Sequence, residues 1–143
     1  MPKPDAALLD PARYPFSCRI EPRFGDLDLN MHINNAALVG ILEDARVRFH
    51  ATSGYHAAMK GLMPMVASLA VEYLDQGFFP DPLTIHVAPI RLGRTSYTLN
   101  QLVTQGERAI AFAQVVMVCV NEGIPIEISA VFRESVKPWM LRE

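Results

Sequence analysis

The chain has few cysteines, no excess of basic charge and no long apolar run, and each absence excludes a class of protein. Two cysteines in 143 residues, Cys18 and Cys119, are too few and too far apart for a disulfide framework or a cysteine-based metal site. Thirteen Lys and Arg against fifteen Asp and Glu give a net charge of −2, without the basic face that nucleic-acid binding needs. No stretch approaches the roughly 18 apolar residues of a membrane span, and the first residues resemble no signal peptide. We therefore expect a cytoplasmic protein that binds neither nucleic acid nor a membrane.

Apolar residues, in contrast, are abundant. Hydrophobic residues make up 50% of the sequence, which excludes a disordered chain and slightly exceeds an ordinary globular share. The length suits one domain, which we place at residues 16–143. Residues 1–15 hold four of the eleven prolines and are predicted to form an extended lead-in. The excess of apolar residues predicts that further surface is buried between subunits.

A helix over residues 36–50 is the clearest predicted element. Apolar residues recur there at intervals of three and four, namely Leu38, Ile41, Leu42, Ala45 and Phe49. Val39 and Val47 widen this apolar stripe, which predicts a helix largely enclosed by other structure. Either Asn34 or Asn35 can cap its start through a side-chain oxygen.

The rest of the chain is mostly strand-like. Strands are predicted over 16–24, where Pro22 cuts the strand, and over 65–73, 83–91, 96–104 and 109–120, with a helix over 127–136. A short connection containing Gly106 predicts an antiparallel hairpin, and Pro89 predicts a bulge or an unpaired edge near the end of its strand. One helix with a wide apolar stripe and several antiparallel strands predicts an α+β fold, in which a curved sheet wraps around the helix.

The densest polar cluster lies immediately before the long helix. Asp28, Asn30 and His32 alternate with apolar residues, so an extended backbone would direct all three side chains the same way. Free N–H groups at the helix start would face an electron-rich oxygen. An acid, an imidazole and amides beside such N–H groups could hydrolyse an acyl bond through an oxyanion-like transition state. The same residue types also form turns and caps, which is the favoured role for Asp26.

Short motifs occur in order over about residues 18–137. They are Arg23-Phe24-Gly25-Asp26-Leu27-Asp28, Asn30-Met31-His32-Ile33-Asn34-Asn35, Glu43-Asp44-Ala45-Arg46, Val71-Glu72-Tyr73-Leu74 and Arg91-Leu92-Gly93-Arg94-Thr95-Ser96-Tyr97. Together they resemble the signature of the 4-hydroxybenzoyl-CoA-thioesterase-like hotdog proteins. The resemblance implies a long central helix wrapped by a curved antiparallel sheet of five or six strands. It also implies a homodimer or a tetramer of dimers, with active sites at the subunit interface.

The resemblance further implies hydrolysis of an acyl-CoA or an acyl-carrier-protein thioester to free acid and thiol. Asp28 matches the acid that acts as nucleophile or general base, and Asn35 supplies the N–H that polarises the carbonyl. Asn30 and His32 would position water or the acid. Glu43 is a secondary catalytic candidate, although a solvent-facing or interface charge is the favoured alternative.

The same polar run resembles the first hotdog repeat of plant acyl-carrier-protein thioesterases. The downstream cysteine of those enzymes is absent, with Ala67 and Ser68 near its expected place, which favours a carboxylate mechanism over a thiol.

The resemblance also suggests where coenzyme A would bind. Arg91, Arg94 and Ser96 lie around a strand connection and are candidates for holding the CoA phosphates, an ordinary charged turn being the alternative. CoA is part of the substrate, so no separate cofactor is expected, and the histidines lack the spacing of metal ligands. Three methionines could line an acyl pocket or, as is favoured, fill the core: Met59, Met63 and Met65.

Two other functions stay open from the sequence. A hotdog dehydratase or hydratase would use an acid and a histidine usually placed apart in the fold, whereas here both lie in one loop. A non-catalytic acyl-CoA-binding protein or assembly subunit would not require the polar run of Asp28, Asn30 and His32. Both alternatives are therefore less favoured than a thioesterase.

Overall fold

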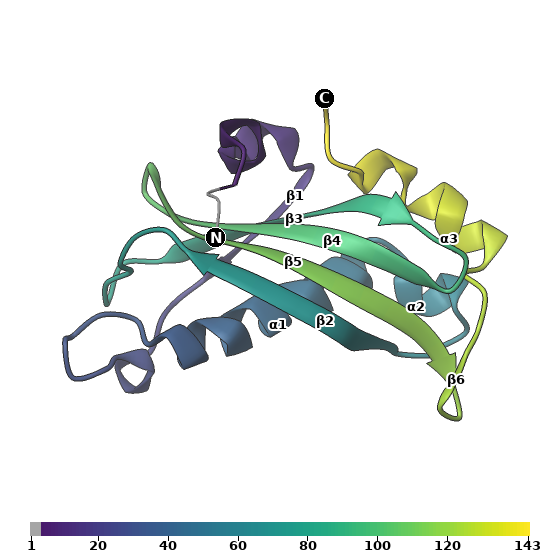
Figure 1. Ribbon diagram of the computed structural model, residues 1–143, viewed down its shortest axis with the longest axis horizontal. Helices are drawn as coiled ribbons and strands as arrows, with labels where there is room; N and C mark the ends of the chain where they lie inside the picture. The colour runs from purple at the N-terminus through teal and green to yellow at the C-terminus, as the bar shows by residue number, and fades with distance from the viewer. Residues whose placement is uncertain (1–3) are drawn as a thin grey trace.

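Helix α1 (Asn35–Thr52) lies across one face of a curved antiparallel sheet (Figure 1). The computed structural model describes residues 4–143. The five apolar residues that recur at intervals of three and four are all buried: Leu38, Ile41, Leu42, Ala45 and Phe49. The prediction that Val47 widens this buried stripe is wrong, because Val47 is 50% exposed while the polar Arg46 and His50 are buried. One flank of α1 therefore buries polar side chains against the sheet.

Asn34, rather than Asn35, caps α1. Its Oδ1 accepts a hydrogen bond from the N–H of Ala36 at 2.7 Å. Asn34→Ala is expected to lower the free energy of unfolding by about 1 kcal/mol, because that N–H loses its partner. Urea unfolding measures this change, and Asn35→Ala is the matched control, expected to cost less than about 0.5 kcal/mol. Equal losses in the two variants would contradict the assignment of the cap.

The sheet confirms the predicted α+β architecture of five or six strands. Its main strands are β1 (Phe16–Ile20), β2 (Pro64–Tyr73), β3 (Leu83–Leu92), β4 (Ser96–Gln105) and β5 (Arg108–Asn121). They lie in the order β1-β3-β4-β5-β2, and the short β6 (Ile124–Pro125) pairs with β5. The predicted hairpin is β4–β5, and the register shifts between Pro89 and Arg91 as expected. Strand β2 is an edge of the sheet.

The segments outside the main sheet differ more from the predictions. The first strand ends at Ile20, short of residue 24 and before Pro22, the residue predicted to cut it, and a 3-10 turn (Phe24–Asp26) follows. Short helices α2 (Tyr55–Ala58) and α3 (Ala130–Ser135) complete the fold, the latter inside the predicted helix over 127–136. No helix within residues 4–143 is long and apolar enough to cross a membrane.

The prediction of an extended lead-in is wrong for its described part. Residues 4–15 contain two 3-10 turns, Ala6–Leu9 and Pro11–Arg13. The reason is local, because Asp5 and Asp10 accept hydrogen bonds from backbone N–H groups two residues further on and so cap these turns. Residues 1–3 of the predicted lead-in lie outside the described residues.

Candidate active site

Asp28 lies in a tight turn just before α1. Its N–H donates to the carbonyl oxygen of His32 at 2.9 Å, and the N–H of Met31 donates to the carbonyl oxygen of Asp28 at 3.0 Å. Its side-chain Oδ1 accepts from the N–H of Asn30 at 2.9 Å and from that of His32 at 3.4 Å. No group among residues 4–143 hydrogen-bonds to Oδ2. One carboxylate oxygen therefore holds the turn, and the other is available to a ligand.

The prediction of an extended run at Asp28, Asn30 and His32 is wrong. The backbone turns back on itself here, and Met31 adopts a left-handed conformation with φ of 61°. The side chain of Asn30 is exposed, and the ring of His32 packs edge-on against Phe78 with 5.4 Å between centroids. Asn30 and His32 thus approach the carboxylate of Asp28 with their backbone N–H groups. The turn is favoured because it gives Oδ1 two backbone donors, which an extended backbone would not supply.

Asp26, the first acid of the motif, has the structural role expected for it. It is only 7% exposed, and it accepts hydrogen bonds from the backbone N–H of Arg23 at 2.8 Å and from the Arg23 guanidinium at 3.1 Å. Burial alone would raise the pKa of Asp26, but these bonds from Arg23 outweigh burial and hold the pKa below its usual value. The two acids of the motif therefore differ, because only Asp28 keeps an oxygen unbonded.

Gly77 fixes the far side of the turn. The N–H of Ile33 donates to the carbonyl oxygen of Gly77 at 2.8 Å, and a Cβ on Gly77 would lie 2.9 Å from Ile33 Cδ1. Gly77→Ala is therefore expected to lower the free energy of unfolding by about 1 kcal/mol through overpacking. Ile33→Val removes Cδ1, so a double-mutant cycle in urea should show a smaller cost of Gly77→Ala in that background. If the losses of stability in the two single variants simply added up in the double variant, the contact with Ile33 Cδ1 would not be the reason that Gly77→Ala is destabilising.

The first turn of α1 supplies a free donor beside this loop. The cap on Asn34 uses the N–H of Ala36, whereas the N–H of Asn35 has no acceptor within residues 4–143. The hydroxyl of Tyr73 donates to the carbonyl oxygen of Asn35 at 2.9 Å, which ties the helix start to the end of β2. Because a helix N-terminus favours negative charge, the N–H of Asn35 can polarise a carbonyl oxygen.

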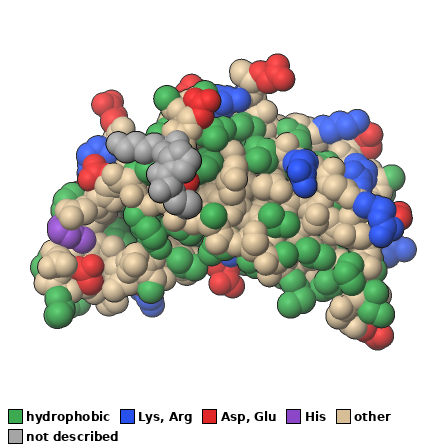
Figure 2. All heavy atoms as spheres, in the orientation of Figure 1, with side chains coloured by type: hydrophobic (Ala, Val, Ile, Leu, Met, Phe, Trp, Pro, Cys, Tyr) green, Lys and Arg blue, Asp and Glu red, His purple; other side chains and the backbone are tan. Residues whose placement is uncertain are grey.

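Exposed hydrophobic side chains surround the turn. Phe24 is 69% exposed, Met31 is 58% exposed and Leu29 is fully exposed. Figure 2 shows hydrophobic side chains beside a histidine and an acidic side chain at the end of the molecule where this loop lies. Apolar surface of this kind is typical of a face that binds a ligand or another subunit.

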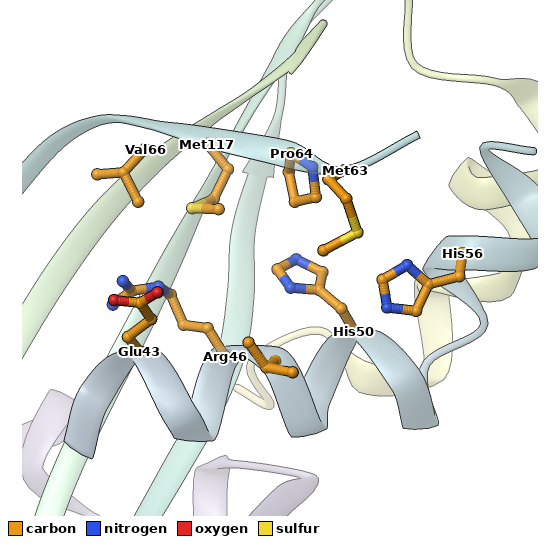
Figure 3. Close-up of a pocket in the computed structure, with 9 residues that line it drawn as sticks. Glu43, Arg46, His50, His56, Met63, Pro64, Val66 and Met117 are labelled. Atoms are coloured by element: carbon orange, nitrogen blue, oxygen red, sulfur yellow. The ribbon is translucent and has the colours of Figure 1, made fainter. Parts of the chain in front are cut away.

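Further along α1, a cavity of about 180 Å³ lies between the helix and the edge strand β2 (Figure 3). It is lined by Glu43, Arg46, Val47, His50, His56, Met63, Pro64, Val66 and Met117. Glu43, Arg46 and His50 rise from α1 toward the strand side of the cavity (Figure 3). Glu43 follows Asn35 by eight residues, which is about 12 Å along the helix axis. Of the three methionines, Met63 lines the cavity, Met59 is buried in the core and Met65 is exposed.

Hydrogen bonds to β4 hold the polar floor of the cavity. Arg46 Nη1 donates to Gln101 Oε1 at 3.0 Å, and Gln101 Nε2 donates to the carbonyl oxygen of Leu42 at 2.9 Å. His50 Nε2 lies 2.6 Å from the hydroxyl of Tyr97. Burial lowers the pKa of Arg46, and burial with the nearby His56 lowers the pKa of His50 to about 4. His50 is therefore neutral at pH 7.

This polar floor was not predicted from the sequence, although a signal was present. Glu43, Arg46 and His50 follow one another at intervals of three and four, the same spacing as the apolar stripe. Polar residues at that spacing indicate a polar face of the helix, and the burial of Arg46 and His50 on this face depends on the sheet.

The candidates for CoA binding lie at the other end of the sheet. Arg91, Arg94 and Ser96 surround the turn between β3 and β4, opposite the loop that precedes α1 (Figure 1). Arg91 is exposed, and Arg94 forms an exposed ion pair with Glu127 at 3.0 Å. A single chain therefore does not bring these residues next to Asp28. Within residues 4–143, no three His, Cys, Asp or Glu side chains form a group that could hold a metal ion.

The chain is similar to known thioesterase-like proteins in sequence and in fold. A family model described as the thioesterase-like superfamily matches residues 22–139. A thioesterase from Thermus thermophilus, solved in complex with coenzyme A and Zn, is 30% identical with a TM-score of 0.79, covering 87% of this chain and 93% of that one. A structure described as a predicted thioesterase from Bacillus stearothermophilus is 23% identical with a TM-score of 0.81, covering 90% and 98%, and this likeness confirms the hotdog fold.

A curated relative is matched over part of its length. The uncharacterized protein YsmA of Bacillus subtilis is 29% identical over 89 residues, which are 62% of this chain and 60% of that protein. The match therefore spans less than two thirds of this relative.

Proposed function

Because the chain belongs to the thioesterase-like superfamily, we propose that it hydrolyses an acyl-CoA to the free acid and CoA with Asp28 as nucleophile or general base. One observation carries the assignment of Asp28. Its Oδ2 has no hydrogen-bond partner within residues 4–143. Asp28 precedes the N-terminus of α1, where the N–H of Asn35 also lacks an acceptor. Thioester hydrolysis needs a carboxylate oxygen to activate water or attack the carbonyl carbon, and a donor to stabilise the negative charge on the carbonyl oxygen.

The proposed reaction begins when the N–H of Asn35 donates to the thioester carbonyl oxygen, on which negative charge grows. As general base, Asp28 takes a proton from water while the water oxygen attacks the carbonyl carbon. As nucleophile, Asp28 attacks that carbon itself, and water then hydrolyses the resulting anhydride. In both routes the C–S bond breaks and the thiolate takes up a proton. Turnover in H₂¹⁸O separates the routes, because only the nucleophilic one can place label in the Asp28 carboxylate.

Coenzyme A as the carrier is supported by the CoA complex of the Thermus thermophilus relative. We assign its phosphates to Arg91, Arg94 and Ser96, which requires two copies of the chain. Within residues 4–143, strand β2 pairs with β5 alone, and its exposed residues 65–68 leave the other edge open to a second copy. Antiparallel pairing of β2 with its copy about a two-fold axis brings the β3–β4 turn of one copy toward the Asp28 end of the other. A homodimer, or a tetramer of such dimers, is therefore part of the proposal.

A panel of acyl-CoAs with detection of released thiol tests this function. Short, long, aromatic and carboxylate-ended acyl groups should be included, with an acyl-carrier-protein thioester as the alternative carrier. Thiol release from at least one CoA thioester, above the rate without protein, is expected. Hydration of an enoyl-CoA without thiol release, or tight binding without any turnover, would contradict a thioesterase.

A further inference from the structure

The cavity between α1 and β2 contains a buried charge that the proposed hydrolysis does not use. Building on the proposed function, we propose that this cavity selects short acyl groups that end in a carboxylate, and that Arg46 binds this carboxylate. The site is the one shown in Figure 3, with Arg46 on its floor and the side chains of Met63, Pro64 and Val66 opposite.

The guanidinium of Arg46 is buried and forms no salt bridge within residues 4–143. Arg46 is only 4% exposed, and its one hydrogen bond from the side chain goes to the neutral oxygen of Gln101. No carboxylate among residues 4–143 forms a salt bridge with it, and its Nε and Nη2 have no acceptor there. A buried charge that forms no ion pair is costly, whereas a carboxylate can accept two parallel hydrogen bonds from one guanidinium. The Nε and Nη2 groups of Arg46, which have no acceptor within residues 4–143, therefore favour an anionic oxygen group in the cavity.

The size of the cavity limits the acyl group. A protein cavity of about 150 Å³ holds one benzene molecule, so the 180 Å³ here accept a group of about that size. Side chains on a helix lean toward its N-terminus, so the guanidinium of Arg46 reaches back toward the level of Glu43, about 12 Å from Asn35. The hydrogen bonds from the Asn35 N–H to the thioester carbonyl and from the Arg46 guanidinium to the carboxylate each take up about 3 Å of these roughly 12 Å. Roughly 6 Å then remain between the carbonyl and the carboxylate of the acyl group. Only a short acyl chain spans this distance.

The other charged groups at the cavity do not cancel this preference. The charge of Glu43 acts on Arg46 and raises its pKa, but Glu43 is exposed, so solvent and salt screen that charge. His50 is neutral at pH 7, and His56 is half-buried at the far end from Glu43 (Figure 3). Arg46 is thus the charged side chain that is buried at the cavity. The remaining walls are apolar: Val47, Met63, Pro64, Val66 and Met117.

Binding of two stable thioether analogues of CoA tests the proposal without any need for turnover. One carries an S-(4-carboxybutyl) group and the other an S-pentyl group, which differ in charge at the end and little in length. By calorimetry at pH 7, the wild-type protein is expected to bind the carboxylate-ended analogue at least 10-fold more tightly. Arg46→Met should abolish that ratio. Arg48→Met is the matched control, because Arg48 is an exposed residue of α1 paired with Asp44 outside the cavity.

A second variant keeps the test decisive if Arg46→Met does not fold. Gln101→Glu retains Arg46 but places a carboxylate 3.0 Å from its Nη1, so the preference should again be lost. Equal affinity of the wild type for both analogues, no binding of either, or a preference that survives both variants would overturn the proposal. Thiol release is measured separately, so a protein that prefers the carboxylate-ended analogue yet hydrolyses no acyl-CoA would disprove the proposed function alone.

Discussion

Asp28→Asn is expected to lower kcat/KM for the best acyl-CoA by about 10³-fold, the loss typical of removing a catalytic acid or base. Asn keeps the Oδ1 acceptor that receives the N–H groups of Asn30 and His32, so the turn should persist. What disappears is the anionic oxygen that takes a proton from water or attacks the carbonyl carbon. Thiol release measures the activity, and urea unfolding should show a change within about 0.5 kcal/mol.

Asp26→Asn is the matched control, because Asp26 is the other acid of the same motif. Both of its oxygens accept hydrogen bonds from Arg23, and an amide can satisfy only one of these donors. We expect a loss of about 1–3 kcal/mol in the free energy of unfolding, with kcat per folded molecule nearly unchanged. Full activity of Asp28→Asn would disprove the assigned mechanism. If Glu43→Gln then abolished turnover, the catalytic acid would be the one on α1.

The elements that sequence could predict here are those with a repeated local pattern. Helix α1 and the strands β2 to β5 carry an apolar periodicity over nine or more residues, and each was placed to within two residues at either end. The first strand ends before Pro22, the residue that cuts it in the sequence, but its short apolar pattern does not show the exact end. The pairing of β2 with β5 connects residues far apart in the chain, which no local pattern encodes.

The candidate site was predictable in composition but not in shape. Asp28 and Asn35 could be singled out because acids and amides before a helix imply either capping or chemistry. The turn that exposes one oxygen of Asp28 depends on a left-handed Met31, a conformation that is uncommon for residues other than glycine. Burial of Arg46 and His50 depends on partners in β4, Gln101 and Tyr97, that lie about fifty residues away. Such partners become visible only when the sheet is assembled.

Acidification is expected to remove about 3 kcal/mol of stability through His50 alone. Burial lowers the pKa of His50 in the folded chain to about 4 from its ordinary value of 6.5. Between these pH values the unfolded chain binds a proton that the folded chain does not, so the free energy of unfolding falls as the pH falls. The contribution is complete above pH 6.5, declines by about 1.4 kcal/mol per pH unit below it, and is gone near pH 4.

Urea unfolding at several pH values between 7.5 and 4 measures this dependence in the wild type and in His50→Gln. The variant is expected to lose stability at pH 7 but to show a shallower slope, so the two curves converge toward pH 4. Phe49→Leu is the matched control, because it weakens the adjacent buried position on α1 without removing a titrating group, and it should shift the curve without changing its slope. Parallel curves for the wild type and His50→Gln would show that His50 is protonated equally in the folded and unfolded chains. In that case burial beside Tyr97 would not disfavour the charged form of His50.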